Sequence, residues 1–168
     1  MATSILTAQR LREVLDYDQE TGILTWKIQA SNRIKVGSQA GAMLKTGYLS
    51  ISIDGKLHRA HRLVWLWVHG VWPNADLDHI NGIRTDNRIA NLRDVSRTTN
   101  QQNLRSARGD NTHSGMLGVY LTDKVGKPWR ASIKTDGKDK HLGNFSTKEE
   151  AHSAYLDAKR KLHTGCTI

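Results

Sequence analysis

The sequence has very little cysteine: Cys166 is the only one among 168 residues, and it lies near the C-terminal end. One cysteine excludes an intrachain disulfide, and it excludes a metal cluster held by several thiolates of the same chain. This cysteine content fits a reducing compartment, and we expect a cytoplasmic protein.

Long apolar runs are also missing. The longest, LVWLWV at residues 63–68, is far too short to cross a bilayer. The first residues, MATSILTAQRLREVLDYD, lack the apolar core of a secretion signal. We therefore expect a soluble, unexported protein with no membrane partner.

Acidic residues are outnumbered, with 16 against 25 lysines and arginines, so the formal net charge is +9 and the isoelectric point is near 9.9. Both halves of the chain share this basic excess. Such a balance suits a polyanion such as DNA or RNA, although a basic surface can also serve solubility or contact a membrane surface. The charge favours a nucleic acid partner without establishing it.

The length allows one ordinary domain or two small ones with modest cores. The segment NQQNLRSARGDNTHSG, at residues 100–115, has almost no apolar residues and mixes Arg, Gly, Ser and Asn, which is typical of a linker. We place a boundary near residues 107–111. The predicted domains are residues 1–108 and 109–168.

Periodicity predicts the elements of the first domain. Residues 7–16 have helical spacing behind Thr7, a predicted N-cap, and TGILTWKI at residues 21–28 alternates like a strand. Residues 47–61 are typical of a hairpin that turns at Asp54-Gly55. HRLVWLWVHG, at residues 61–70, is most simply a buried helix ended by its final glycine.

The element that follows this helix is predicted from apolar residues that recur every three positions. Ile89, Leu92 and Val95 recur near helical spacing, so we expect a helix from Asn87 to about Thr98, with Asp86 and Asn87 as its caps. The residues just before it are then a short hairpin-like loop, in which Asn81-Gly82 is a turn.

The second domain has the pattern of a small sheet and one helix. Residues 116–145 contain three short strands separated by turns at Val125-Gly126 and Asp136-Gly137. A helix follows, with Ser146 as the predicted N-cap and Glu149 at the capping-box position. Its apolar face is predicted to be Ala151, Ala154, Tyr155 and Ala158, and Gly165 is a stop signal.

The stretch DHINGIRTDNRIANLR, at residues 78–93, is too polar to be core, because buried polar groups need partners. Hydrolysis of a phosphodiester needs a base that activates water and a cation that stabilises the developing charge. A neutral imidazole serves the first role, and Asp and Asn oxygens suit Mg²⁺ for the second. Asp78 and His79 are adjacent, so on an extended segment they point to opposite faces.

The segment DHINGIRTDNRIANLRDVSRTTNQQN, with HRLVWLWVHGVWP upstream of it, resembles the core of the HNH endonuclease family, in the subgroup of phage and intron homing endonucleases. The resemblance implies a ββα-metal (His-Me finger) motif, in which a two-strand hairpin and a helix grip one divalent ion. It implies that His79 is the general base and that Asp78 and Asn100 are metal ligands. Asn91 then holds the loop that carries the base.

Position 100 departs from the family name, which implies histidine there, although asparagine occurs in the homing subgroup. An all-oxygen site argues against tight Zn²⁺ binding. The implied cofactor is one divalent ion, Mg²⁺, with Mn²⁺ as the alternative. We interpret His61 as a structural histidine packed under the hairpin.

The C-terminal segment resembles a second module, the DNA-binding domain of plant APETALA and ethylene-response factors, which is also found fused to HNH nucleases in phages. The shared elements are GVY, WRASI, LGNF, STKEEA and AY. The resemblance implies a three-stranded sheet in the major groove with a helix behind it. The candidate DNA contacts are Tyr120, Trp129, Arg130, Ser132, Lys134 and His141. For Trp129, packing in the core is the alternative to a DNA contact.

The sequence thus predicts an α+β protein: a ββα-metal nuclease core followed by a small three-stranded antiparallel sheet with one helix. The predicted function is a metal-dependent endonuclease that cuts double-stranded DNA in a bacterial or phage-infected host cell. A monomer has one active site and nicks one strand, whereas a dimer is the alternative for double-strand cleavage. The rival function is a non-catalytic DNA-binding regulator, and an RNA-directed nuclease is a further alternative.

Overall fold

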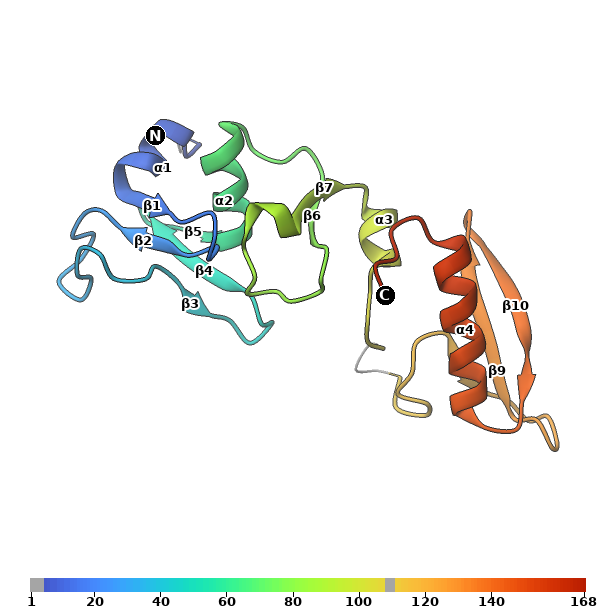
Figure 1. Ribbon diagram of the computed structural model, residues 1–168. Helices are drawn as coiled ribbons and strands as arrows, with labels where there is room; N and C mark the ends of the chain where they lie inside the picture. The colour runs from blue at the N-terminus through green and yellow to red at the C-terminus, as the bar shows by residue number, and fades with distance from the viewer. Residues whose placement is uncertain (1–4, 108–110) are drawn as a thin grey trace. The chain divides into compact units, whose positions relative to one another are not determined.

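The computed structural model describes residues 5–107 and 111–168 (Figure 1). The chain divides into two compact units, Met1–Ser96 and Arg97–Ile168. This division comes earlier than the domain boundary expected near residues 107–111, part of which lies outside the described residues. The domain assignment 1–108 and 109–168 stays a prediction. Across the described ranges, none of the helices has both the length and the apolar character needed to span a bilayer.

From residue 5 onward, the first unit combines two α-helices and a short 3₁₀ helix with three small antiparallel sheets. β1 pairs with β2, β4 lies between β3 and β5, and β6 pairs with β7. The elements are α1 (Ala8–Val14), β1 (Leu15–Tyr17), β2 (Leu24–Trp26), β3 (Ala42–Met43), β4 (Leu49–Ile53), β5 (Lys56–Arg59), α2 (Ala60–His69), β6 (Asp76–His79), η1 (Ile89–Asn91) and β7 (Leu92–Val95).

Local signals correctly predicted the start of α1 and the end of α2, whereas α1 ends at Val14 and not at residue 16, because β1 begins at Leu15. The hydroxyl of Thr7 accepts a hydrogen bond from the Arg10 N–H and caps α1. Gly70 takes the left-handed conformation after α2, with φ of 77°, and its N–H bonds the Leu66 carbonyl. Buried side chains of α1 and α2 meet in the core of the unit, with Leu11 and Leu63 both fully buried.

The predicted hairpin is also confirmed. β4 and β5 pair in antiparallel register, and the two residues between them are Asp54 and Gly55. Their φ angles are 48° and 76°. Positive φ at both central residues is the requirement of the tight turn that matches the twist of a hairpin.

The helix expected from Asn87 to Thr98 is wrong. The chain instead makes the short turn η1, continues as the strand β7, and begins a helix only at Arg97. Leu92 pairs with His79 in the ladder between β6 and β7. The Asp94 carboxylate accepts hydrogen bonds from two backbone N–H groups, of Asn74 and Ala75, which anchors the strand. The spacing of three residues between Ile89, Leu92 and Val95 therefore does not mark one helix, because Ile89 lies in η1 and the other two lie in β7.

The second unit is a three-stranded antiparallel sheet in the order β10-β9-β8 with α4 along one face (Figure 1), as the sequence predicted. Val119, Ala131 and Ala151 form the centre of its small core. The elements are α3 (Arg97–Gln102), β8 (Val119–Leu121), β9 (Trp129–Thr135), β10 (Lys138–Phe145) and α4 (Lys148–Leu162).

The N-cap of α4 is Thr147, one residue after the predicted Ser146. Thr147 and Glu150 make the reciprocal bonds of a capping box. The letters STKEE contain two overlapping boxes with the same spacing, so the sequence alone does not choose between them. The buried face of α4 includes Lys159, whose ammonium group donates to the Leu104 carbonyl and whose pKa is lowered by burial.

The packing of α4 on the sheet can be tested at Gly118. A Cβ atom there would lie 2.0 Å from Cδ2 of Tyr155, whereas nothing lies within 4 Å of the corresponding position at Gly126. Both glycines have positive φ, at 69° and 77°. We expect Gly118→Ala to lower the free energy of unfolding of the second unit by about 1–3 kcal/mol more than Gly126→Ala does, because only the first overpacks the core. Urea denaturation followed by circular dichroism measures the difference, and equal losses would contradict the packing.

Candidate functional site

The hairpin of β6 and β7 positions Asp78. Asp78 and Arg93 face each other across the ladder. The Arg93 guanidinium donates from Nε and Nη2 to Oδ2 of Asp78, at 2.9 and 2.7 Å. The aspartate side chain is only 8% exposed and that of the arginine 25%. A buried carboxylate is costly without compensation, and Arg93 supplies the opposite charge.

His79 follows at the end of β6 and is almost fully buried. Its Nε2 lies 3.1 Å from Oδ1 of Asn87. An amide oxygen can only accept, so Nε2 carries the hydrogen, and in the neutral ring the lone pair is on Nδ1. Burial lowers the pKa of His79, and the Asn87 bond opposes this only in part. The neutral ring is therefore the dominant form at pH 7, as a general base requires.

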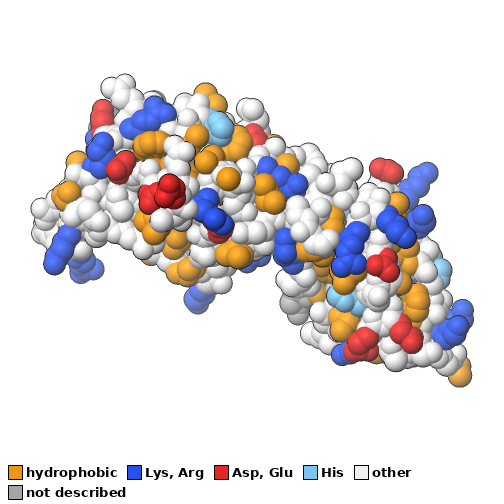
Figure 2. Space-filling model, viewed as in Figure 1, with side chains coloured by type: hydrophobic (Ala, Val, Ile, Leu, Met, Phe, Trp, Pro, Cys, Tyr) orange, Lys and Arg blue, Asp and Glu red, His pale blue; other side chains and the backbone are white. Residues whose placement is uncertain are grey.

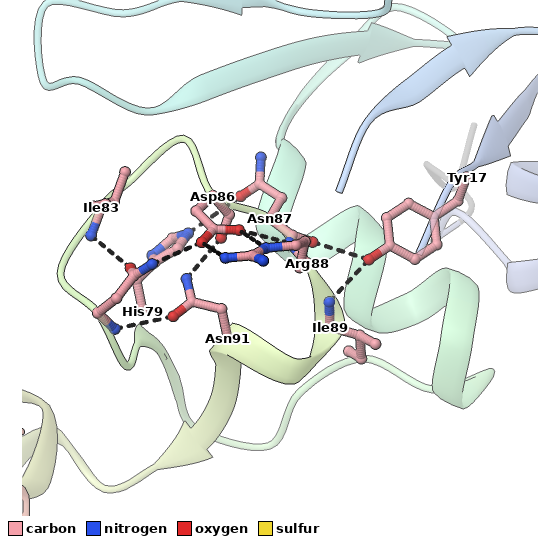
Figure 3. Close-up of polar contacts among 9 residues, drawn as sticks. Tyr17, His79, Ile83, Asp86, Asn87, Arg88, Ile89 and Asn91 are labelled. Carbon is pink, nitrogen blue, oxygen red and sulfur yellow. Dashed lines mark hydrogen bonds and ion pairs between the residues drawn. The ribbon is translucent and has the colours of Figure 1, made fainter. Parts of the chain in front are cut away.

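Asn91 holds together the loop between the two strands (Figure 3). Its Nδ2 donates to the Asp86 carbonyl at 2.8 Å, and its Oδ1 accepts from the Asn81 N–H at 2.9 Å. Its own carbonyl accepts from the Ile80 N–H. The side chain thus contacts the loop directly after His79. This geometry suits the loop-holding role that the family resemblance implies.

Asp86 and Asn87 do not cap a helix, contrary to the sequence prediction. Asp86 is paired with Arg88, at 2.6 Å, and also accepts from Nδ2 of Asn81 at 2.7 Å (Figure 3). The Arg88 guanidinium lowers the pKa of Asp86 to about 2. Asn87 is buried and its side chain holds the ring of His79. Both residues therefore organise the loop around the histidine.

Tyr17 is a part of the site that sequence reasoning missed. Its hydroxyl donates to the Asn87 carbonyl at 3.0 Å and accepts from the Ile89 N–H at 2.9 Å (Figure 3). These bonds attach β1 to the far end of the loop. No local pattern marks such a contact, because it joins segments that are distant in the sequence.

Aromatic rings surround His79 on the side of α2. The ring of His61 lies 5.1 Å from that of His79, and Tyr48 lies 5.2 Å from His61 and 5.9 Å from His79, centroid to centroid. Burial lowers the pKa of His61 to about 3. His61 is thus a neutral packing partner of the catalytic candidate, in agreement with the structural role expected for it.

Asn100 lies in α3, which belongs to the second unit, so its predicted role as a metal ligand stays a prediction. Within the described part of the chain, no group of three or more His, Cys, Asp or Glu residues could hold a metal. A thiolate or imidazole cluster for Zn²⁺ is therefore not found there. A carboxylate such as that of Asp78 and an amide such as that of Asn100 are oxygen donors of the kind that Mg²⁺ prefers, and this ion takes few protein ligands and completes its shell with water and phosphate.

Five of the six candidate DNA contacts lie on one face of the second unit. In β9, Ala131 and Ile133 are buried while Arg130, Ser132 and Lys134 alternate with them. Cross-strand pairs place Tyr120 opposite Arg130 and His141 opposite Ser132, so these side chains share the face away from α4. Trp129 instead packs with the core, the alternative that the sequence left open. Lysine and arginine side chains are visible on both units in Figure 2.

The burial of His61 predicts acid sensitivity of the first unit. Its folded pKa of about 3 is below the 6.5 of the unfolded chain. Between these values only the unfolded chain binds the proton, so the stability present above about pH 6.5 is lost as the pH falls, by up to about 1.4 kcal/mol for each pH unit.

The measurement is urea denaturation at several pH values, followed by tryptophan fluorescence. We expect His61→Phe, which keeps a ring beside Tyr48, to flatten this pH dependence. His58 and His79, whose pKa values burial also lowers, leave a smaller residual slope. The exposed His69, changed to Phe, is the control. An unchanged slope in His61→Phe would be inconsistent with a buried neutral His61.

Residues 58–102 match the family model of the HNH endonucleases. No curated protein and no solved structure matches the chain. The matched segment begins in β5 and runs through α2 and the β6–β7 hairpin into α3. It includes Asp78, His79 and Asn91. Nucleases of this family generally use a divalent metal ion, and the match suggests DNA nuclease activity for this region.

Proposed function

We propose that this protein is a metal-dependent endonuclease that hydrolyses phosphodiester bonds of double-stranded DNA. The observation that carries the proposal is the buried neutral imidazole of His79, held through Nε2 by Asn87, next to the buried carboxylate of Asp78. Both residues lie in the segment that matches the HNH endonucleases. The order of β6, β7 and α3 is the order of a ββα-metal motif.

The chain's own residues would perform the proton transfer. The Nδ1 lone pair of His79 takes a proton from a water molecule, which attacks the phosphorus atom as the bond to the leaving oxygen breaks. Asn87 keeps the ring in the required tautomer, and Asn91 holds the loop in place. Asp78 and Asn100 would hold one divalent ion, Mg²⁺ or Mn²⁺, which when bound stabilises negative charge on the phosphate and the leaving oxygen.

The second unit would supply affinity and target selection. The sheet face with Tyr120, Arg130, Ser132, Lys134 and His141 carries cationic, polar and aromatic groups, the kinds that contact phosphates and base edges. Within the described residues there is one β6–β7 hairpin with its histidine, so as a monomer the protein would nick one strand. A homing enzyme of phage or intron origin is the biological setting that the resemblance implies.

The catalytic assignment is tested with supercoiled plasmid in Mg²⁺ or EDTA. His79→Ala should slow nicking by roughly 10²- to 10⁴-fold, the range for a general base, and should leave DNA binding nearly intact. The exposed His69→Ala is the matched control. Nicking by His79→Ala at the parental rate would remove the assignment and favour a non-catalytic DNA-binding protein.

Asp78 should behave differently from His79. Asp78→Asn keeps an acceptor for Arg93 but removes the charge, so we expect cleavage to fall and then recover in part as the Mg²⁺ concentration rises. No Mg²⁺ concentration should rescue His79→Ala. Metal titrations of the initial rate distinguish the two, and identical metal dependence in both variants would argue against Asp78 as a ligand.

The role of the sheet face is tested by the salt dependence of DNA affinity. Arg130→Ala and Lys134→Ala should each reduce the slope of log K against log[salt] by about 0.9 for each phosphate that the protein no longer neutralises. Lys161→Ala, on the exposed end of α4, is the control. Fluorescence anisotropy with a labelled duplex in EDTA gives the slopes. If the slope of the control falls as much as those of the other two variants, binding is spread over the whole surface and not located on the sheet face.

A further inference from the structure

Two arginines from separate elements meet at the ring of Tyr48. The Cζ atom of Arg84 lies 5.1 Å from the ring centroid, and that of Arg59 lies 5.5 Å from it. Arg84 belongs to the loop that follows His79, and Arg59 ends β5 directly before α2. At these distances each guanidinium group is attracted to the aromatic ring, so Tyr48 contacts two positive charges. The ring of His79 lies 5.9 Å from the same tyrosine.

The position of Arg84 is fixed by further contacts. Its Nη1 donates to the Thr46 carbonyl at 2.6 Å. Gly47, with φ of 79°, follows in the turn, and a Cβ atom added there would lie 3.6 Å from Cδ of Arg84. An exposed arginine on a loop loses conformational entropy when it is held in this way. The Arg84 side chain is therefore held in one position by these contacts and is not a freely moving surface charge.

Arg59 has an unmet hydrogen-bonding requirement. Its Nη1 is buried and has no hydrogen-bond partner within the described residues. Neither Arg59 nor Arg84 takes part in an ion pair of the described chain. A buried donor without an acceptor is costly and rare in folded proteins. Two guanidinium groups that make no ion pair within the described residues thus contact a tyrosine next to His79, where an anion would neutralise them.

We propose that Arg59 and Arg84 bind one backbone phosphate of the DNA and hold it beside His79. A guanidinium group presents planar, paired donors that match phosphate oxygens, and a pair of such groups suits the non-bridging oxygens of one phosphodiester. The site extends the proposed function, since it rests on His79 acting on DNA. It adds two substrate-binding residues outside the family-implied set of Asp78, His79, Asn91 and Asn100.

The test uses the full chain with Arg59→Gln, Arg84→Gln and the double variant. Arg12→Gln is the matched control, because Arg12 also lies over an aromatic ring, Trp67 at 5.5 Å, and donates to a backbone carbonyl. Affinity for a labelled DNA duplex is measured in EDTA over a range of salt concentrations. Circular dichroism and thermal unfolding check that each variant is folded.

Each single variant should bind about 10- to 100-fold more weakly, the loss expected for charged hydrogen bonds, and its salt slope should fall by less than about 0.9, because the other arginine still contacts the phosphate. The double variant should lose about 0.9 from the slope in total, because both arginines contact one phosphate. Arg59→Lys and Arg84→Lys should keep the parental slope and recover part of the affinity. Arg12→Gln should retain the parental slope.

Unchanged slopes in the glutamine variants would overturn the proposal, and so would an equal fall in Arg12→Gln. If Arg59→Gln does not fold, Arg84→Gln alone decides, because Arg84 is exposed on its loop. These measurements need no cleavage, so they are separate from the test of His79. A failure of His79→Ala to slow nicking would remove the catalytic role and leave the phosphate site standing on its own result.

Discussion

The hydroxyl group of Tyr17 is the contact on which the geometry around His79 depends. It bonds the carbonyl of Asn87 and the N–H of Ile89, and the side chain of Asn87 in turn fixes the imidazole ring. A loop of this length has many conformations in isolation, and ordering it costs conformational entropy. The bonds from β1 offset that cost by attaching the loop to the core of the unit. The orientation of the histidine is thus set from a strand at the beginning of the chain.

A glycine makes this attachment possible. At Gly22, in the turn between β1 and β2, a Cβ atom would lie 2.5 Å from the Arg88 nitrogen and 2.7 Å from the Asn87 carbonyl carbon. Only a residue without a side chain allows the turn to approach the loop backbone so closely. The N-terminal hairpin therefore supports the loop at two points, through the tyrosine hydroxyl and through direct backbone contact.

Those features that depend on a few neighbouring residues could be predicted from the sequence. Thr7 as a cap, Asp54-Gly55 as a turn and Gly70 as a helix end all reflect backbone preferences that act locally. The strand β7 could not be predicted, because its pairing with β6 overrides the helical spacing around Leu92. Tyr17 could not be found either, since its role exists only after the chain has folded.

For the site, the sequence identified the residue types and the structure supplied their partners. Asp78 and His79 were chosen from a motif, and nothing in that motif marked Arg93 or Asn87 as the groups that hold them. Cross-strand contacts of this kind depend on the register in which two strands pair. The spacing of residues within one element carries no information about that register.

If Asp78 holds the proposed metal ion, its pairing with Arg93 separates folding from metal uptake. In small metal-dependent folds, the ligands repel one another or remain unsatisfied until the ion arrives, so the fold forms only with the metal. Here the carboxylate already has a cationic partner across the ladder, which neutralises its charge without an ion. An incoming ion would therefore compete with the Arg93 guanidinium group for the Asp78 carboxylate. The occupancy of the metal site would then depend on whether a substrate phosphate is bound, and not on whether the protein has folded.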